Sequence, residues 1–170
     1  MKRYAIVLAV VVGFVFSGRA QAEFFDGVKL GTGILWSDSS RPTLDAFGGG
    51  IHLSADFRPV PSFIVTPFGE VYAGDKVVKL AGGSLSLAIP MRDFETHILF
   101  IGGGAGFVSL GGASETFVSG HLGYKFPLNE RFGLFFWGKY VQAKNNVMNS
   151  MSAQIGLTYA LFQKRDSSEE

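Results

Sequence analysis

The 170-residue chain contains no cysteine, which excludes disulfide bonds, thiol-ligated metals and a cysteine-linked lipid anchor. Charged residues make up only 17% of it, against a usual value of about 25%. The formal net charge is +1, so the composition does not favour binding to nucleic acid. Beyond residue 22, no apolar run approaches the roughly 20 residues of a membrane-spanning helix. Glycine is abundant instead, with 23 residues, and the mean hydropathy of +0.26 is high for a secreted protein.

The first 22 residues have the pattern of a secretory signal peptide. Lys2 and Arg3 precede an apolar run over residues 4–16, and the small residues Ala20 and Ala22 mark a cleavage site. A membrane anchor is the alternative, but the run is too short to cross a bilayer. We therefore predict export and cleavage after residue 22.

Turn-forming residues divide the rest of the chain into eight segments. The breaks fall at residues 37–45, 58–62, 73–76, 90–94, 109–115, 127–130 and 143–149. Each segment is predicted to have about the 9–11 residues of a tilted transmembrane strand, which is longer than the usual soluble strand. No segment has a convincing helical period, so an all-β fold is predicted.

The segments alternate between apolar and small or polar residues. The stretch "FGGGIHLSADFR" (residues 47–58) is the clearest case, because every second residue from Phe47 to Phe57 is apolar. Residues 28–36, 84–89, 118–126 and 151–161 alternate in the same way. Residues 65–73, 99–107 and 132–140 are less regular, and a register shift of one residue would exchange their two faces.

The second face of these segments differs from the solvent-exposed face of a soluble sheet. That face should be rich in Lys, Glu, Thr and Gln, but here it holds Gly, Ser and Ala with isolated charges. Small residues fit the inside of a narrow eight-stranded barrel, whose lumen only close-packed side chains can fill. We therefore expect the apolar face to point outward into lipid. The predicted lumen charges are His52, Asp56, Glu70, His121, Lys125 and Lys139.

Aromatic residues on the outward face are predicted to form two girdles, as in transmembrane β-barrels. With the N-terminus in the periplasm, one rim would carry Phe57, Phe63, Phe94, Tyr124, Phe126, Phe132 and Tyr159. The other rim would carry Trp36, Phe47, Phe107, Phe117 and Tyr140. Large lumen residues, namely Phe68, Phe100, Phe135 and Trp137, would stack over the inward glycines.

The chain resembles the small outer-membrane barrels of the opacity-protein and OmpA-like families. The resemblance rests on "TPFGEVYAG" (66–74), "LFIGGGAGF" (99–107), "GHLGYKFPLNERFGLFFWGKY" (120–140) and "AQIGLTYALF" (153–162). It implies an eight-stranded antiparallel up-and-down transmembrane β-barrel over residues 23–162. The polar residues 163–170 depart from the usual aromatic chain end of such barrels and are expected to form a disordered tail.

The lumen charges have two interpretations. They could form a proton or ion path, or a mutually neutralising network that allows charges to sit inside a barrel. The resemblance to OmpA-like barrels favours the neutralising network, with Glu70 and Lys139 as partners.

No catalytic, metal or cofactor site is predicted. Ser119 and His121 share a face but lie two residues apart on one strand, and deacylase barrels carry a His-x-Ser motif on the lipid side of a late strand, where this chain has no histidine. The three histidines at 52, 97 and 121 match no metal motif. The glycine-rich stretches lack the Lys-Ser/Thr of a phosphate-binding loop.

These observations predict a monomeric outer-membrane protein with a structural or surface-interaction role and without an open pore. Its expected partners are membrane lipid and lipopolysaccharide, not nucleic acid, and any surface interaction would use the loops at 37–45, 108–116 and 142–150. Two alternatives remain open, namely a lipid A modifying enzyme and a soluble periplasmic barrel that binds a lipophilic ligand.

Overall fold

A computed structural model describes residues 25–38, 46–91, 94–144 and 148–160. The predicted signal peptide (1–22) and tail (163–170) lie outside these residues. The described chain forms eight strands joined in sequence order. They are β1 (Phe25–Asp38), β2 (Ala46–Val60), β3 (Phe63–Gly74), β4 (Val78–Met91), β5 (Phe94–Leu110), β6 (Ala113–Pro127), β7 (Phe132–Ala143) and β8 (Asn149–Tyr159).

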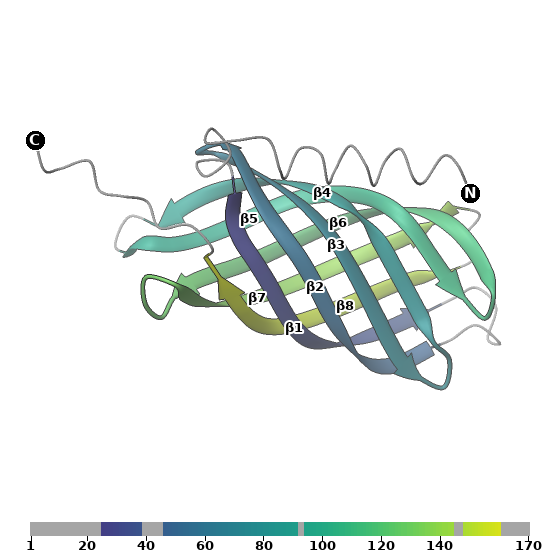
Figure 1. The fold of residues 1–170 in the computed structure, drawn as a ribbon. Helices are drawn as coiled ribbons and strands as arrows, with labels where there is room; N and C mark the ends of the chain where they lie inside the picture. Colours follow the sequence, from purple (N-terminus) through teal and green to yellow (C-terminus); the bar gives the residue numbers. More distant parts are fainter. Residues whose placement is uncertain (1–24, 39–45, 92–93, 145–147, 161–170) are drawn as a thin grey trace, which may run out of the picture.

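The strands close into a barrel (Figure 1). Each strand pairs antiparallel with the next one, and β1 also pairs antiparallel with β8. Lys29 of β1, for example, lies opposite Ser54 of β2 on one side and Thr158 of β8 on the other. Closure leaves no unpaired strand edge in the wall, so backbone groups are satisfied within the sheet. The predicted all-β, eight-stranded, up-and-down barrel is confirmed.

Seven of the eight strands are longer than predicted, with 12 to 17 residues instead of 9–11, and β8 has 11. The largest difference is at residues 108–116, which we expected to form a surface loop. β5 continues to Leu110 and β6 begins at Ala113, so only Gly111 and Gly112 form the turn. Both glycines have a positive φ, 58° and 90°, as a type I′ hairpin turn requires. Ser109 and Ser114, which lie in the predicted loop, are therefore paired strand residues.

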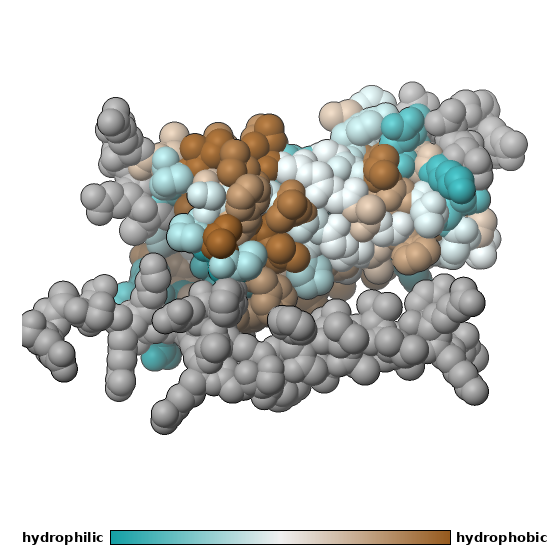
Figure 2. Space-filling model, turned by 90° about the horizontal axis from the view of Figure 1, so that it is seen from above, coloured by the Kyte–Doolittle hydropathy of each residue, from teal (hydrophilic) through white to brown (hydrophobic). Residues whose placement is uncertain are grey.

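In all eight strands, including the three less regular ones, the apolar face points outward and the face of small and polar residues points into the lumen, as predicted. In β3, buried residues alternate with exposed ones from Ile64 to Tyr72, and β7 alternates from Gly133 to Ala143. The outward side is apolar: Leu30, Ile51 and Val118 are each more than 60% exposed. Figure 2 shows one side of this wall, with hydrophobic side chains gathered toward one end and a paler band beside them.

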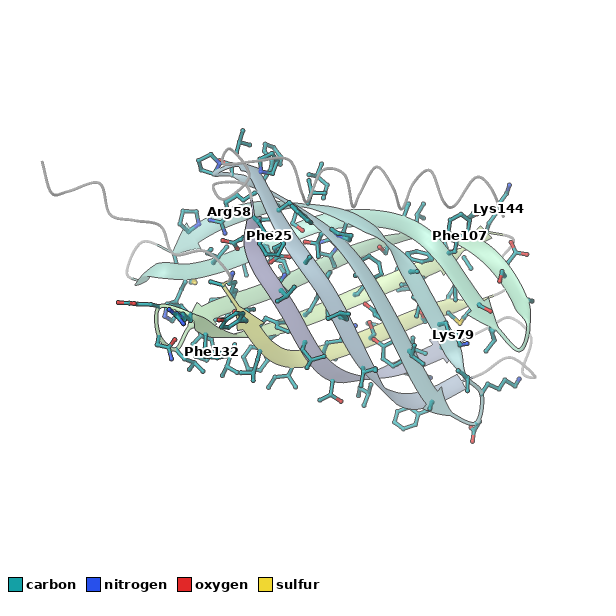
Figure 3. The ribbon with its side chains drawn as sticks, viewed as in Figure 1. Phe25, Arg58, Lys79, Phe107, Phe132 and Lys144 are labelled. Carbon is teal, nitrogen blue, oxygen red and sulfur yellow. The ribbon has the colours of Figure 1, made fainter. Side chains whose placement is uncertain are left out.

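The two ends of the barrel differ in their connections. At one end the strands are joined by residues 61–62, 92–93 and 128–131; at the other, by residues 39–45, 75–77, 111–112 and 144–148. Outer-membrane barrels have short periplasmic turns and longer extracellular loops. We therefore call the end with the 39–45 connection the outer end and the opposite end the inner end. Figure 3 labels Phe25, Arg58 and Phe132 near the inner end and Lys79, Phe107 and Lys144 toward the outer end.

Among the described residues, no helix is long and apolar enough to cross a membrane.

Candidate functional site

The lumen is packed with aromatic rings around Trp137 of β7. The ring of Trp137 lies 5.0 Å from that of His52, 5.2 Å from that of His121, 6.1 Å from that of Phe68 and 6.0 Å from that of Phe100. These rings come from β2, β3, β5, β6 and β7, so they bridge the barrel from several sides. Inward glycines make room for them: a Cβ atom on Gly123 would collide with the Phe100 ring.

Glu70 of β3 is the centre of a buried polar cluster. Lys139 of β7 donates to Glu70 Oε1, and the His52 Nδ1 atom lies 3.0 Å from the same oxygen. A carboxylate oxygen only accepts, so Nδ1 carries the proton, and in the neutral ring Nε2 accepts from Ser54 Oγ at 2.7 Å. The Tyr72 hydroxyl donates to Glu70 Oε2 at 3.2 Å. Because Glu70 and Lys139 are both almost fully buried, each charge depends on the other for stabilisation.

A second buried ion pair joins Lys29 of β1 to Asp56 of β2. The Lys29 Nζ atom is 2.7 Å from Asp56 Oδ2, and Thr66 Oγ1 donates to Asp56 Oδ1 at 2.8 Å. The ammonium also lies over the rings of Phe100 and Trp137, 4.8 and 5.2 Å from their centroids. The alternation of residues 28–36 directs Lys29 to the inward face, but Lys29 was not among the predicted lumen charges.

The third charge group lies at the inner end and is partly exposed. Lys125 Nζ donates to Asp26 Oδ2 at 2.8 Å, and Arg58 Nη2 donates to the same oxygen at 3.3 Å. All three side chains keep 18% to 26% of their surface exposed. Lys125 is therefore separate from the Glu70 cluster. Sequence reasoning missed Asp26, because a bulge between Phe25 and Gly27 interrupts the alternation there.

His121 pairs with a serine that the sequence did not suggest. Its Nε2 atom lies 2.7 Å from Ser86 Oγ on β4, whereas Ser119, its neighbour on β6, makes no hydrogen bond among the described residues. Within the same part of the chain, His121 Nδ1 has no partner either, so no carboxylate orients the ring. The pair is 3% and 5% exposed and packs beside Trp137. A nucleophile–base pair without an orienting group or an approach for substrate is not arranged for catalysis.

Apolar side chains fill the lumen at the outer end. They are Leu35, Val78, Leu80, Val108, Leu110, Phe117, Val141, Ala143 and Met148, each at most 6% exposed. The prediction of Phe117 in the outer girdle is wrong, because Phe117 is 2% exposed and faces inward. Its neighbour Val118 takes the outward position, as strand alternation requires. The lumen is thus closed by hydrocarbon above the charged layer.

The remaining aromatic residues of the predicted girdles with described side chains lie on the outward side of the wall. At the outer end, Trp36, Phe47, Phe107 and Tyr140 are 46% to 64% exposed. At the inner end, Phe57, Phe63, Tyr124, Phe126, Phe132 and Tyr159 are exposed or half-buried. Several pack in pairs, such as Phe132 and Tyr159 with ring centres 5.1 Å apart. The side chain of Phe94 lies outside the described residues.

The described residues contain no group of three or more His, Asp or Glu side chains that could hold a metal ion.

No family model matches the sequence, and no curated protein matches it significantly. Solved structures do resemble the fold. The crystal structure of Neisserial surface protein A aligns with a TM-score of 0.67 at 13% identity, covering 81% of this chain and 97% of that one. Ail of Yersinia pestis, solved with the heparin analogue sucrose octasulfate, aligns at 0.58 and 13% identity, covering 81% and 98%. The N-terminal β-barrel domain of Pseudomonas aeruginosa OprF aligns at 0.53 and 11% identity, covering 79% and 98%. At these identities the similarity establishes the fold.

Proposed function

We propose that this chain is an integral outer-membrane β-barrel with a structural or surface-interaction role, without an open pore and without enzymatic activity. The observation that carries the proposal is the reversed polarity of the wall. Leu53 is 59% exposed, whereas the adjacent His52 and Ser54 are at most 4% exposed. A soluble protein rarely exposes such an extensive apolar surface, but a lipid-embedded barrel needs one.

The packed lumen supports the absence of a pore. The aromatic rings around Trp137, the Glu70–Lys139 pair and the apolar residues at the outer end together fill the lumen. The buried charges have opposite charges or hydrogen-bonding groups close by, which supports the neutralising interpretation over an ion path. The closed wall also has no free edge for pairing with a second copy, which supports a monomer.

The surface role draws support from the structural neighbours. They include a neisserial surface protein and the attachment invasion locus protein of Yersinia pestis. The outer end of this chain would carry any such interaction through the 39–45 and 144–148 connections. The predicted 108–116 site is reduced to a two-residue turn, so it offers little surface to a partner.

The two tryptophans provide a direct test of the membrane assignment. Trp36 is 64% exposed on the outer wall, whereas Trp137 is 3% exposed in the lumen. We would fold Trp36→Phe and Trp137→Phe, each with one remaining tryptophan, into vesicles of brominated phosphatidylcholine. Brominated chains should quench the fluorescence of Trp36 strongly and that of Trp137 weakly. Equal quenching, or recovery of the native protein in the periplasmic fraction after osmotic shock, would contradict the proposal.

The enzymatic alternative has a separate test. Mass spectrometry of lipid A from cells with and without the protein should give identical acyl-chain patterns. A removed or added acyl chain that depends on the protein would overturn the non-enzymatic assignment.

A further inference from the structure

Two hollows indent the outward wall near the outer end, one on each side of Phe107. The first, of about 470 Å³, extends from Leu30 of β1 across β2 to β5 and reaches Ser114 of β6. The second, of about 750 Å³, extends over β5 to β7. Phe107 lines both hollows and is 53% exposed, so its ring forms a ridge between them.

Small residues form the floor of the first hollow. Gly69 of β3 pairs with Leu53 on one side and Ala81 on the other, and all three line the hollow. A Cβ atom built on Gly69 would meet nothing within 4 Å, so the space above the backbone is open. In the second hollow, Ala105 pairs with Val118 beside the ridge. Both floors are apolar and wide enough for hydrocarbon.

Each hollow has a lysine at its outer end. Lys79 lines the first hollow together with Ser109 and Ser114, and Lys144 lines the second together with Gln142. Both lysines are exposed, and no ion pair is found for either among the described residues. Figure 3 shows both on the outer half of the barrel, with Phe107 between them. Each hollow is therefore amphipathic, with its cation at the level where headgroups begin.

We propose that the two hollows bind one lipid A molecule, with acyl chains on both sides of Phe107 and phosphates paired with Lys79 and Lys144. The inference rests on the proposed outer-membrane function and names a ligand for it. Three strand spacings of ~4.8 Å separate β4 from β7, which places the two lysine backbones about 15 Å apart along the wall. Lipid A carries several acyl chains and a phosphate at each end of a disaccharide, so it matches two apolar hollows with two separated cations. A glycerophospholipid with a single diacylglycerol unit, such as phosphatidylglycerol, has only one phosphate and two chains.

The test uses the full-length mature protein in phosphatidylcholine nanodiscs, with binding of purified bisphosphorylated lipid A followed by native mass spectrometry. One molecule should bind per barrel. Lys79→Gln and Lys144→Gln should each weaken binding about fivefold, since a lysine near an anionic surface contributes about this factor, and the double variant about 25-fold. Lys76→Gln changes a lysine in the neighbouring turn that lines neither hollow, and should change binding less than twofold. Dephosphorylated lipid A should bind the wild type and all four variants equally weakly.

The apolar part of the site has its own pair of variants. Gly69→Leu fills the first hollow and should weaken lipid A binding severalfold. Gly120→Leu adds the same side chain at an outward glycine that also has open space above it but lines neither hollow, and should leave binding unchanged. Folding of each variant is checked by its Trp36 quenching in brominated lipid.

Equal lipid A affinity in wild type, the double lysine variant and Gly69→Leu would overturn the inference. Equal affinity for phosphatidylglycerol and lipid A would also overturn it, because it would indicate general attraction of anionic lipid. In both cases retained Trp36 quenching would leave the outer-membrane proposal standing. If brominated lipid failed to quench Trp36 in the wild type, both the outer-membrane proposal and the lipid A inference would be overturned.

Discussion

Lys139 on β7 donates a hydrogen bond to Glu70 on β3, although the two strands face each other across the barrel and the residues are 69 positions apart in the sequence. The bond therefore joins opposite walls of the lumen. Tyr72 and His52 add two further donors to the same carboxylate, so the cluster fixes the spacing of β2, β3 and β7.

Glu70→Gln should destabilise the barrel by about 3–5 kcal/mol, because it leaves the Lys139 ammonium buried without a counter-charge. Adding Lys139→Met should recover part of the loss, since no buried charge then remains at this site. Urea unfolding in detergent micelles measures both values. A double variant whose loss equals the sum of the two single losses would show that the residues do not stabilise one another.

Two glycines on β6 provide a matched test of how tightly the lumen is packed. Gly123→Ala directs its methyl group into the Phe100 ring and should cost about 1–3 kcal/mol, as overpacking does in close-packed cores. Gly120→Ala points outward, where a Cβ atom would meet nothing within 4 Å, and should be neutral or slightly stabilising. Unfolding midpoints of the two variants should therefore move in different directions or by clearly different amounts. Similar losses would mean that the two faces of β6 are packed alike.

The direction of each side chain was predictable because successive side chains along a strand point to opposite faces. Alternation put Trp137 and Phe135 inside and Phe136 outside, even in a segment that is apolar on both faces. Gly133 and Lys139 share the inward face with these two rings, and both residue types suit a lumen better than lipid. Phe117 is the exception: its aromatic character suits a girdle, but alternation along residues 117–118 directs it inward and Val118 outward.

Contacts between distant strands were less predictable. The Ser86–His121 pair joins β4 to β6, and which serine meets the histidine depends on how the strands are staggered around the closed barrel. No local pattern specifies that stagger. The Asp26–Lys125 pair was hidden for another reason, since the bulge at Phe25/Gly27 adds a residue that interrupts the period of two.

The β5–β6 turn should depend on the positive φ of Gly111, which is 58°. Gly111→Asn should be tolerated, because asparagine adopts this conformation readily in type I′ turns. Gly111→Val should cost about 1–2 kcal/mol, the penalty of a left-handed conformation for a residue with a Cβ atom. Ala113→Val is the control, since it places the same side chain at the first residue of β6, where β-branching is favourable. If Gly111→Val and Ala113→Val unfold at the same urea concentration, the turn is not of this type.

Enlarging apolar residues on the two faces of the wall separates a lipid-facing surface from a protein core. Leu85 and Leu122 are 52% and 53% exposed, whereas Leu80, on the same strand as Leu85, is 2% exposed in the lumen. Leu85→Phe combined with Leu122→Phe should leave the unfolding free energy nearly unchanged, because lipid chains move aside for a larger ring. Leu80→Phe should cost about 1–3 kcal/mol, because the packed side chains around residue 80 cannot move aside for the larger ring. Leu85→Arg should cost about 2–4 kcal/mol in a bilayer, but a soluble core would reject it as well, so it does not distinguish the two environments. The phenylalanine variants do: a loss of several kcal/mol in the Leu85/Leu122 pair would mean that this face packs against protein, and the membrane assignment would be wrong.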